Sequence, residues 1–468
     1  MRVTIKNYKS IRQASIELRP GLTILAGPNG SGKTCLLSGL QFLRDIFRVG
    51  AAQALALQGG ARRVFRHRRT EMSFSFTRPY GDRTYHKSKI PCELSWDVTI
   101  AQAGPEKLAT ITRESIEIIA RPPKGTARLF SIVVARPDSG RARLTTRLAS
   151  EEEFGRDLFS GWEAASGRKG KPALAKMLRG NVIPSIRKRL KDEPDRSCVP
   201  MLLGLDRVLD EVITSFRFLS EYNILPEIAR ASTEQLPFAR MAPNGQGVSE
   251  VLDALEKRRY DKLERLAFEE TEDLYFPAYR HFPYWWRYRR FYRPHTRRHY
   301  QGALESINRE LAAAVGPITH VSVGTDVGNG RRFVRFHSER DSFFPEEVSD
   351  GTVKWLCILV SLFVPFSRVY LLEEPENFLH PWMQQRLIAI MRDQAESNKT
   401  IFLLASHSAT IINAAAPEEI LIVKQGKRGT EVSAVRDLTA IKGVLAESQF
   451  HVGDLWVSGA IGGVPVDE

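Results

Sequence analysis

Cysteine is scarce in this sequence, and long apolar runs are missing. The four cysteines, Cys35, Cys92, Cys198 and Cys357, lie far apart in a chain of 468 residues and form no CxxC pair. Such spacing argues against a disulfide framework and a cysteine-rich zinc site, and it fits a reducing cytoplasm. The longest apolar run has 12 residues, 355–366, whereas a membrane-spanning helix needs about 20. We therefore expect a soluble, cytoplasmic protein that does not contact a membrane.

Two further absences narrow the class of protein. The first 18 residues alternate polar and apolar side chains and lack the apolar centre of a signal peptide. Apolar residues over 202–216 recur every three or four positions, but no heptad pattern continues for long, which argues against coiled-coil arms. With 43% hydrophobic and 26% charged residues the chain can bury a sizeable core, and bulk disorder is excluded.

Acidic residues are missing from two strongly basic segments. The chain has 68 Lys and Arg against 54 Asp and Glu, a formal net charge of +14. Residues 62–69 contain five arginines and no acid, and residues 275–300 contain seven arginines, three histidines and no acid. Twelve of the 14 net charges therefore lie in 34 residues, and the remainder of the chain is close to neutral.

The order of strand and helix patterns predicts an α/β fold. Strand-like segments lie around Val3 and Ile5, over Leu22–Ala26 and over most of 71–135, whereas helical periodicity dominates 151–268. The last third alternates again, and there we predict helix 353–366, strand 368–372, helix 383–395 and strand 400–405. Short apolar strands alternating with helices are typical of a parallel sheet covered by helices.

The simplest architecture is a nucleotide-binding head that is split in sequence. We assign residues 1–145 to its N-terminal lobe, residues 301–468 to its C-terminal lobe, and residues 146–300 to a mainly helical insertion. The sequence shows no internal repeat and no low-complexity linker.

A phosphate-binding loop, GPNGSGKT, lies between a predicted strand and a predicted helix over 34–47. Its glycines let successive backbone N–H groups surround phosphates, and the helix N-terminus adds positive potential. Lys33 would contact the β- and γ-phosphates, and the Thr34 hydroxyl would be a ligand of Mg²⁺. The candidate nucleotide-binding residues are Gly27, Pro28, Asn29, Gly30, Ser31, Gly32, Lys33 and Thr34.

Two carboxylates follow the apolar strand that ends at Leu372. Glu373 at the strand end is a candidate for holding Mg²⁺, and Glu374 is a candidate general base that polarises the attacking water. Paired acids also occur at ordinary solvated strand ends. Their position downstream of the phosphate-binding loop favours the catalytic interpretation.

His407 follows the next apolar strand, 33 residues beyond Glu374. A histidine at a strand end is most often a polar surface residue. A parallel sheet, however, would bring this strand end to the edge where ligands gather. We therefore keep His407 as a second catalytic candidate.

The segment Ser349–Thr352, SDGT, precedes the apolar helix predicted from Val353. One interpretation is a plain helix cap. The other uses the same geometry, because a hydroxyl, a glycine N–H and a helix dipole together form an anion site suited to a γ-phosphate offered by another subunit. Ser349 and Gly351 therefore join the nucleotide-binding candidates.

These four motifs together resemble those of the ABC-class ATPases in the clan that includes RecF and the structural-maintenance-of-chromosomes proteins. By that resemblance, residues 27–34 are the Walker A motif and Ser349–Thr352 the signature loop. Leu371–Glu374 is similar to Walker B with its catalytic glutamate, and His407 to the switch histidine. The spacing of the motifs suits that family.

The sequence is more similar still to the overcoming-lysogenisation-defect-like, AAA-type ATPase subunits of bacterial antiviral systems such as Septu, PARIS and retron-associated modules. The likeness lies in the opening KNYKSI, the SDGT form of the signature, EEPENFLHP at 373–381 and the segment 453–465. Two features depart from the pattern. Glu373 stands where most ABC proteins have Asp, and the Q-loop glutamine has no clear counterpart, with Gln58 a weak candidate.

The resemblance implies an ATPase that uses ATP and Mg²⁺ and closes head to head around ATP as a homodimer or higher homo-oligomer. It implies a sensor or regulatory subunit of an antiviral complex, with a separate nuclease as effector and with contact either to nucleic acid, DNA or RNA, or to that partner effector. A RecF-type repair or recombination ATPase, or a non-hydrolysing scaffold for a nuclease, stays open as the alternative.

Two other functions fit the sequence less well. The separation of 316 residues between Lys33 and Ser349 is several times what a transporter ATPase needs. Only 61 residues follow His407, without the clustered Asp and Glu of a nuclease, so we expect any nuclease to be a separate subunit.

The basic segment 275–300 combines its seven arginines with 11 aromatic residues. Arginine neutralises phosphates and aromatic rings stack on unpaired bases, so one interpretation is a nucleic-acid contact. A protein interface and a plain structural element are the alternatives. The candidate contact residues are Trp285, Trp286, Arg287, Arg289 and Arg290. We interpret residues 62–69 as a solvated basic loop.

Overall fold

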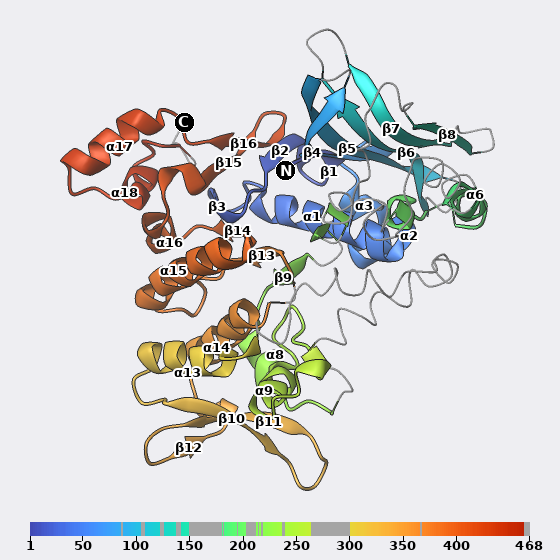
Figure 1. Ribbon diagram of the computed structural model, residues 1–468. Coiled ribbons are helices and arrows are strands. Elements are labelled where there is room, and N and C mark those ends of the chain that lie inside the picture. Colours follow the sequence, from blue (N-terminus) through green and yellow to red (C-terminus); the bar gives the residue numbers. More distant parts are fainter. Residues whose placement is uncertain are drawn as a thin grey trace.

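The computed structural model describes residues 1–85, 88–103, 108–121, 126–136, 142–148, 180, 182–193, 195–202, 212–213, 215–216, 219–235, 239–263, 300–365 and 367–462. Figure 1 shows two large sheets with helices around them and a smaller helical and strand region below. The segment with Trp285, Trp286, Arg287, Arg289 and Arg290 lies outside the described residues.

A mostly parallel sheet joins the two ends of the chain. In the described residues its order is β16 (Gly429–Ala434), β15 (Ile420–Gly426), β3 (Gly21–Ala26), β14 (Ile401–Ser406), β13 (Val369–Glu373) and β9 (Ser220–Tyr222). Neighbouring strands are parallel except for the β15–β16 hairpin. The strands predicted at 368–372 and 400–405 are confirmed by β13 and β14.

Both faces of this sheet are covered, which is why its central strands are apolar throughout. Alternate residues of β13 and β14 contact opposite cores: Leu371 and Leu403 one, Leu372 and Leu404 the other. On the first face lies α1 (Lys33–Val49). On the second lie α14 (Asp350–Phe363), α15 (Pro381–Asn398) and α16 (Ala409–Ala414), of which α14 and α15 correspond to the predicted helices 353–366 and 383–395.

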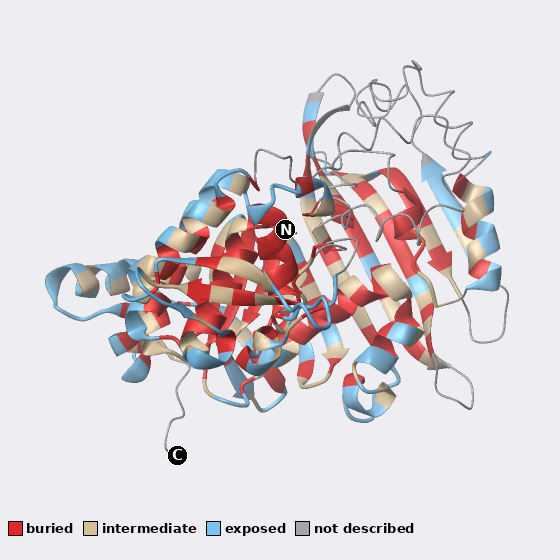
Figure 2. Ribbon diagram, turned by 90° about the horizontal axis from the view of Figure 1, so that it is seen from below, coloured by how far each residue is buried: buried red, intermediate tan, exposed pale blue. Residues whose placement is uncertain are grey.

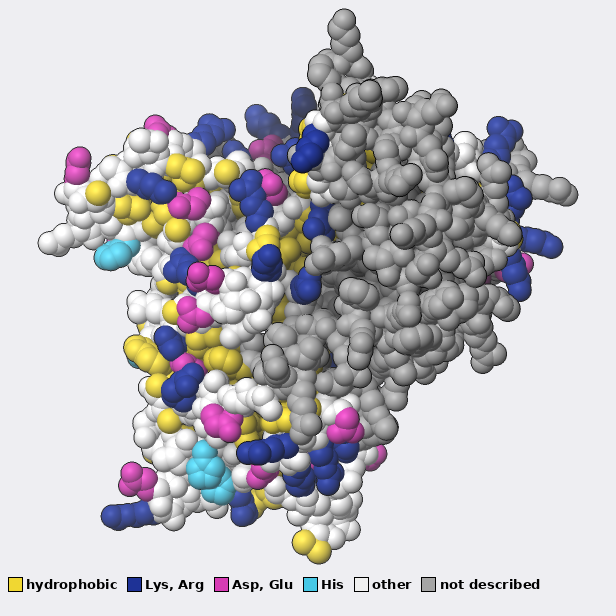
Figure 3. Space-filling view, in the orientation of Figure 1, with side chains coloured by type: hydrophobic (Ala, Val, Ile, Leu, Met, Phe, Trp, Pro, Cys, Tyr) yellow, Lys and Arg dark blue, Asp and Glu magenta, His cyan; other side chains and the backbone are white. Residues whose placement is uncertain are grey.

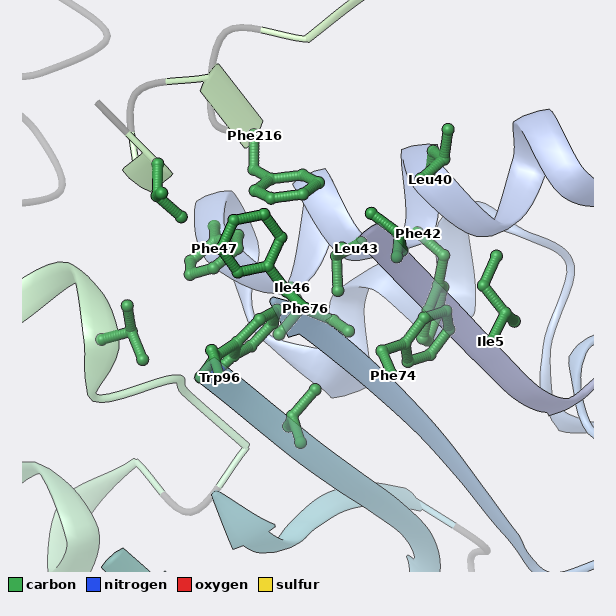
Figure 4. Close-up of a cluster of buried hydrophobic side chains, with 14 of the residues drawn as sticks. Ile5, Leu40, Phe42, Leu43, Ile46, Phe47, Phe74, Phe76, Trp96 and Phe216 are labelled. Carbon is green, nitrogen blue, oxygen red and sulfur yellow. The ribbon is translucent and has the colours of Figure 1, made fainter. Parts of the chain in front are cut away.

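An antiparallel sheet packs on the other side of α1. Its order in the described residues is β2 (Ile11–Glu17), β1 (Arg2–Tyr8), β4 (Glu71–Tyr85), β5 (Ser88–Ala103), β6 (Leu108–Ala120), β7 (Ala127–Ala135) and β8 (Arg143–Leu148). The strand-like pattern over 71–135 is thereby confirmed. Figure 4 shows the aromatic core between helix and sheet, where Phe42 meets Phe74 at 5.7 Å and Phe47 meets Trp96 at 4.7 Å between ring centroids.

A second layer covers α14 on its side away from the parallel sheet. It consists of α8 (Pro226–Arg230), α9 (Val248–Glu256), α13 (Ala303–Ala314) and a small sheet of β10 (His320–Thr325), β11 (Arg332–His337) and β12 (Ser342–Phe343). These elements lie in the lower part of Figure 1. Because α14 is buried on both sides, nearly all of its residues are inaccessible, as the red ribbon of Figure 2 illustrates for the core elements.

The remaining elements are short and lie around the edges. They are α2 (Ala51–Leu57), α3 (Ala61–Val64), α6 (Ile183–Asp192), α17 (Leu438–Glu447), α18 (Val452–Val457) and the 3₁₀ helices η2 (Val199–Leu202), η3 (Pro345–Glu347) and η4 (Pro417–Glu419). Within the described residues, no helix combines the length and the apolar character that crossing a membrane requires.

The structure describes only parts of the segment 146–300, which the sequence predicts to be a mainly helical insertion. Strand β9 lies within this segment, pairs in parallel with β13 and is part of the mostly parallel sheet. Helices α8 and α9 pack on α14 and the small sheet instead of forming a separate body. A three-residue strand has no periodicity that distinguishes it from a loop, so its pairing is decided by tertiary contacts.

Candidate nucleotide-binding and catalytic site

The loop between β3 and α1 has the backbone that phosphate binding needs. Gly30 and Gly32 have φ values of 77° and 104°, a region that other residues rarely enter. The ammonium of Lys33 donates to the carbonyl oxygens of Gly27 at 2.7 Å and Pro28 at 3.0 Å, across the mouth of the loop. Burial lowers the pKa of Lys33, and the carboxylates of Glu374, Glu376 and Glu373 oppose that shift. A phosphate would thus find a cation that carries no direct carboxylate partner.

The β15–β16 hairpin supports this loop from behind. A Cβ atom on Gly27 would lie 2.1 Å from the carbonyl oxygen of Val423, and one on Gly32 would lie 2.1 Å from Thr430 Oγ1. Both glycines are therefore required for close packing, and Gly32 is required for its backbone conformation as well. Thr430 in turn lies 2.7 Å from the Ser10 hydroxyl, which links the hairpin to the turn between β1 and β2.

Thr34 and Glu373 meet at the carboxyl edge of the parallel sheet. The Thr34 hydroxyl donates a hydrogen bond to Glu373 Oε1, across 339 positions of sequence. Strand β14 lies between β3 and β13, and all three end at this edge. Hydroxyl and carboxylate oxygens suit Mg²⁺, which usually takes one or two such ligands and completes its shell with water and phosphate. No group of three His, Cys, Asp or Glu forms a fuller metal site among the described side chains, so these two residues fit a shared protein–phosphate site.

Glu374 has a strained backbone next to His407. Its φ is 43°, which costs a residue other than glycine roughly 1 to 2 kcal/mol. Its N–H donates to Ala405 O at 2.9 Å, and Asn377 Nδ2 donates to its carboxylate at 3.0 Å. His407 Nδ1 lies 3.6 Å from Glu374 Oε1, which is slightly longer than a hydrogen bond. A small movement of either side chain would bring the two atoms within hydrogen-bond distance. The two predicted catalytic residues are therefore side by side.

Glu376 is part of this arrangement, although the sequence analysis did not select it. It is 7% exposed and accepts hydrogen bonds from Ser406 Oγ at 2.8 Å and from the backbone N–H of His407 at 3.0 Å. Its other oxygen, Oε2, is buried without a hydrogen-bond partner. Glu376 thus holds the end of β14 and the backbone of His407 in place. The third glutamate of EEPE was the available signal, but spacing alone does not tell a buried acid from an exposed one.

The signature-like segment begins α14 as a capped helix. Ser349 Oγ accepts a hydrogen bond from Thr352 N at 3.2 Å. This geometry is expected for a plain helix cap and equally for an anion site at the start of the helix. The guanidinium of Arg230, at the end of α8, donates to Pro345 O and Val348 O, each at 2.8 Å, and to the Asp350 carboxylate at 2.5 Å. Arg230 therefore fixes the segment that leads into the helix. Nothing in the local sequence around Arg230 indicates this role, since its partners lie more than a hundred residues away.

The strand register also places an amide beside Glu373. Tyr222 pairs with Leu372 in the parallel sheet. The residues that follow them, Asn223 and Glu373, therefore lie at the same edge of that sheet. Asn223 is exposed there. Gln58, the weak Q-loop candidate, lies at the end of α2, where its amide oxygen accepts from Lys9 Nζ and Ser38 Oγ, each at 3.0 Å. Of the two amides, only Asn223 follows a strand of the parallel sheet.

A basic surface formed by three turns borders the phosphate-binding loop. The turns after β1, before β4 and between β15 and β16 converge, because Arg66 donates to Ser10 O at 2.7 Å and to Arg428 O at 3.0 Å. We call this the three-turn surface; its basic residues are Arg12, Arg66, Arg68, Arg69, Lys427 and Arg428. Figure 3 shows Lys and Arg side chains gathered where β2 and β16 lie in Figure 1. Within the described part of the chain, none of the six forms an ion pair.

Two segments of the chain match family models that are described as AAA domains. Residues 2–43 match the family described as "AAA domain", and residues 278–413 match the family described as "AAA domain, putative AbiEii toxin, Type IV TA system". The DNA replication and repair protein RecF of Erwinia tasmaniensis is 42% identical over 67 residues, which are 14% of this chain and 16% of that protein. RecF of Desulfitobacterium hafniense is 40% identical over 57 residues, 12% of this chain and 16% of that protein. The shared segments are thus short parts of their relatives.

Solved head domains of structural-maintenance-of-chromosomes proteins resemble the whole chain weakly. One, an SmcHead bound to the C-terminal winged-helix domain of ScpA, has a TM-score of 0.42 and 12% identity and covers 94% of this chain and 98% of its own. Another is an Smc head domain with an extended coiled coil, bound to the C-terminal domain of ScpA derived from Pyrococcus furiosus. It has a TM-score of 0.42 and 11% identity, and the match covers 96% of this chain and 99% of that one. The sequence matches and the sheet described above agree at a coarser level: residues 2–43 and 278–413 are similar to AAA-type ATPase domains, and the chain has a mixed α/β fold with a strand, a glycine-rich loop and a helix in the order of a P-loop.

Proposed function

We propose that this protein binds ATP with Mg²⁺ and hydrolyses it to ADP and phosphate. The observation that carries the proposal is the hydrogen bond between Thr34 and Glu373. Two motifs from opposite ends of the chain meet at the residues that P-loop chemistry requires, beside the buried ammonium of Lys33. If residues 27–34 were only a glycine-rich turn without a function, nothing would require Thr34 to contact Glu373.

In this proposal each side chain of the site has a role in ATP hydrolysis. The loop N–H groups and Lys33 would hold the phosphates, and Thr34 and Glu373 would hold Mg²⁺, which would supply positive charge to stabilise the phosphates during hydrolysis. Glu374 accepts a proton from the attacking water as general base, and its carboxylate is oriented by Asn377. His407 lies next to that carboxylate, where it can contact the γ-phosphate or the same water.

We further propose that two copies close around ATP, as a homodimer or as part of a higher homo-oligomer. The start of α14 offers a glycine N–H and a helix N-terminus, which favour a phosphate. Ser349 and Gly351 would thus bind the γ-phosphate held by the partner. Arg230 supports this assignment, because its three hydrogen bonds hold the segment ready before any ligand arrives.

The biological setting that we favour is a bacterial antiviral complex in which this chain is the sensor or regulatory ATPase and a separate nuclease is the effector. The SDGT and EEPENFLHP segments support it, as does a family match whose description names a toxin of a toxin–antitoxin system. The RecF similarity supports the alternative, a repair or recombination ATPase, and covers only 14% of the chain. A non-hydrolysing scaffold for a nuclease is the third candidate.

Nucleic acid is the partner that the charge distribution favours. The three-turn surface presents arginines and lysines that no carboxylate neutralises in the described residues, and such side chains bind phosphate backbones. For the segment 275–300 three interpretations remain: a protein interface, a structural element, or a nucleic-acid contact. The nucleic-acid contact would be made by Trp285, Trp286, Arg287, Arg289 and Arg290.

Replacing Glu374 by Gln tests the proposed reaction. The amide cannot accept the proton of water, so E374Q should bind ATP as tightly as wild type while its kcat falls about 100-fold or more. It should also accumulate as an ATP-bound dimer, measured by analytical ultracentrifugation with and without ATP and Mg²⁺. E396Q, at an exposed glutamate of α15, is the matched control. A wild-type protein without ATP hydrolysis would rule out the enzyme, and an active E374Q would remove Glu374 from its role.

A further inference from the structure

Lys354 is a buried lysine in the second turn of α14 that none of the motifs includes. Its side chain is 4% exposed. It points from the helix that begins with Ser349–Thr352 toward the loop after β13, where its ammonium donates to the carbonyl oxygen of Glu374 at 3.2 Å. The ammonium also lies 5.8 Å from the ring centroid of Phe378. A lysine is rarely buried to this extent unless its charge has partners.

We infer that Lys354 is a positioning residue for the proposed ATPase reaction, and that it holds the backbone of Glu374 in the conformation that aims its carboxylate at the phosphate edge. This inference rests on the proposed function, because Glu374 is the general base only if the protein hydrolyses ATP. Lys354 acts through the backbone carbonyl of Glu374.

The conformation that Lys354 holds is a strained one. Glu374 has a φ of 43°, in the left-handed region, and the surrounding structure must maintain it. Its N–H is held by Ala405 O at 2.9 Å, and its carbonyl accepts both Asn377 N and Lys354 Nζ at 3.2 Å. Among these partners only Lys354 comes from α14. Without it, the carbonyl loses its one charged donor, and the peptide group gains freedom to relax toward an ordinary conformation.

The contact belongs to a tight junction between α14 and the loop. A Cβ atom on Gly351 would lie 2.4 Å from the carbonyl oxygen of Phe378, so this close approach requires glycine. Phe378 also has a left-handed φ, 67°. The start of α14 thus touches the loop at two points, Gly351 with Phe378 and Lys354 with Glu374. Any shift of α14 is passed directly to the backbone that carries the general base.

The charge of Lys354 is compatible with this role. Burial lowers its pKa to about 8, and the carboxylates of Glu376 and Glu374 oppose the shift. The side chain therefore stays mostly protonated at neutral pH. A charged donor makes a stronger hydrogen bond to a carbonyl than a neutral one does, which suits a residue that must keep a strained peptide in place.

Replacing Lys354 by Met separates positioning from folding. Methionine keeps most of the length and packing of the lysine stem but removes its charge and its donors. We expect the kcat for ATP hydrolysis to fall about 10- to 100-fold, since a small misplacement of a reacting group has effects of that size. The KM for ATP and the Kd for a fluorescent ATP analogue should stay within about twofold of wild type. The Tm should be unchanged or higher, because an apolar group replaces a buried charge.

Two further variants complete the experiment. K354R keeps a charged donor to the carbonyl of Glu374 and should recover part of the lost kcat, whereas K188M, at an exposed lysine of α6, should match wild type throughout. A K354M protein with wild-type kcat would overturn the inference while leaving the ATPase intact. A lowered Tm, or a loss that appears in ATP affinity instead of kcat, would also overturn it, because Lys354 would then serve folding or binding. A wild-type protein that hydrolyses no ATP would end both proposals together.

Discussion

The phosphate-binding loop and the three-turn surface both attract anions, and they are built in opposite ways. The loop uses backbone N–H groups and a single ammonium, Lys33, which is 6% exposed. The three-turn surface uses several side chains, of which Arg12, Arg68 and Lys427 are exposed and make no side-chain hydrogen bond or ion pair with any residue that the structure describes. The two regions are neighbours, because Thr430 contacts both Gly32 and Ser10.

The difference predicts two kinds of binding. Donors fixed in a preorganised and partly buried loop select the shape and charge of one phosphate group, and salt weakens their effect little. Exposed side chains with many conformations recognise charge without shape, and salt screens them strongly. A net charge of +14 taken as one number would hide this distinction.

The largest expected effect comes from removing Lys33. K33A should lower kcat/KM for ATP hydrolysis by about 100-fold or more, because the loop loses the buried ammonium of Lys33. Binding of single-stranded and duplex DNA or RNA to the ATP-free protein should not change. Steady-state ATP hydrolysis and fluorescence anisotropy with labelled oligonucleotides measure the two properties. Equal losses in both would show that the two regions are one site.

Reversing charges on the three-turn surface should produce the opposite pattern. The triple variant Arg12→Glu, Arg68→Glu and Lys427→Glu should weaken nucleic-acid binding about 10- to 100-fold. The slope of log K against log salt concentration should become less steep by about three, because about three fewer counterions are released. ATP hydrolysis without nucleic acid should stay within about twofold of wild type. The matched control is R187E, K188E and K191E on α6, which changes the charge by the same amount at exposed positions.

The outcome of that pair of variants decides the partner. If the control triple weakens binding as much as the three-turn triple, the attraction follows net charge and the surface has no special part. If neither variant nor wild type binds nucleic acid but anionic phospholipid vesicles bind the wild type, the proposed partner is wrong. Vesicles with and without phosphatidylserine supply that second arm of the measurement.

The smallest expected effect lies where the two regions touch. T430V removes the hydroxyl that lies 2.7 Å from the Ser10 hydroxyl, in a side chain that is 2% exposed. The free energy of unfolding should fall by about 1 kcal/mol, the usual contribution of one such hydrogen bond. The KM for ATP should rise by less than about fivefold, because Gly32 keeps its backbone conformation. Chemical denaturation and steady-state kinetics measure the two changes, and an unchanged stability would show that this contact is dispensable.

Local patterns in the sequence were sufficient for the elements of the head. The strands around residues 371 and 403 are apolar because both faces of the parallel sheet are covered, and that pattern is visible without a structure. The glycine spacing of the phosphate-binding loop is similarly a local requirement. The strand β9, within the segment predicted to be a mainly helical insertion, could not be found in this way, since it has only three residues and gains its strand conformation from pairing with β13.

The sequence by itself determined the phosphate-binding loop, the acids after β13 and the α/β fold, because each follows from spacing over a few residues. Only the tertiary structure decided which distant groups meet. Thr34 reaches Glu373 across 339 positions, and Lys354 reaches the strained backbone of Glu374 from a different element. The basic segment 62–69, interpreted as a solvated loop, joins Arg12 and Arg428 beside the nucleotide site. Such meetings depend on how sheets and helices pack, and packing energy is a property of the whole fold that no local pattern records.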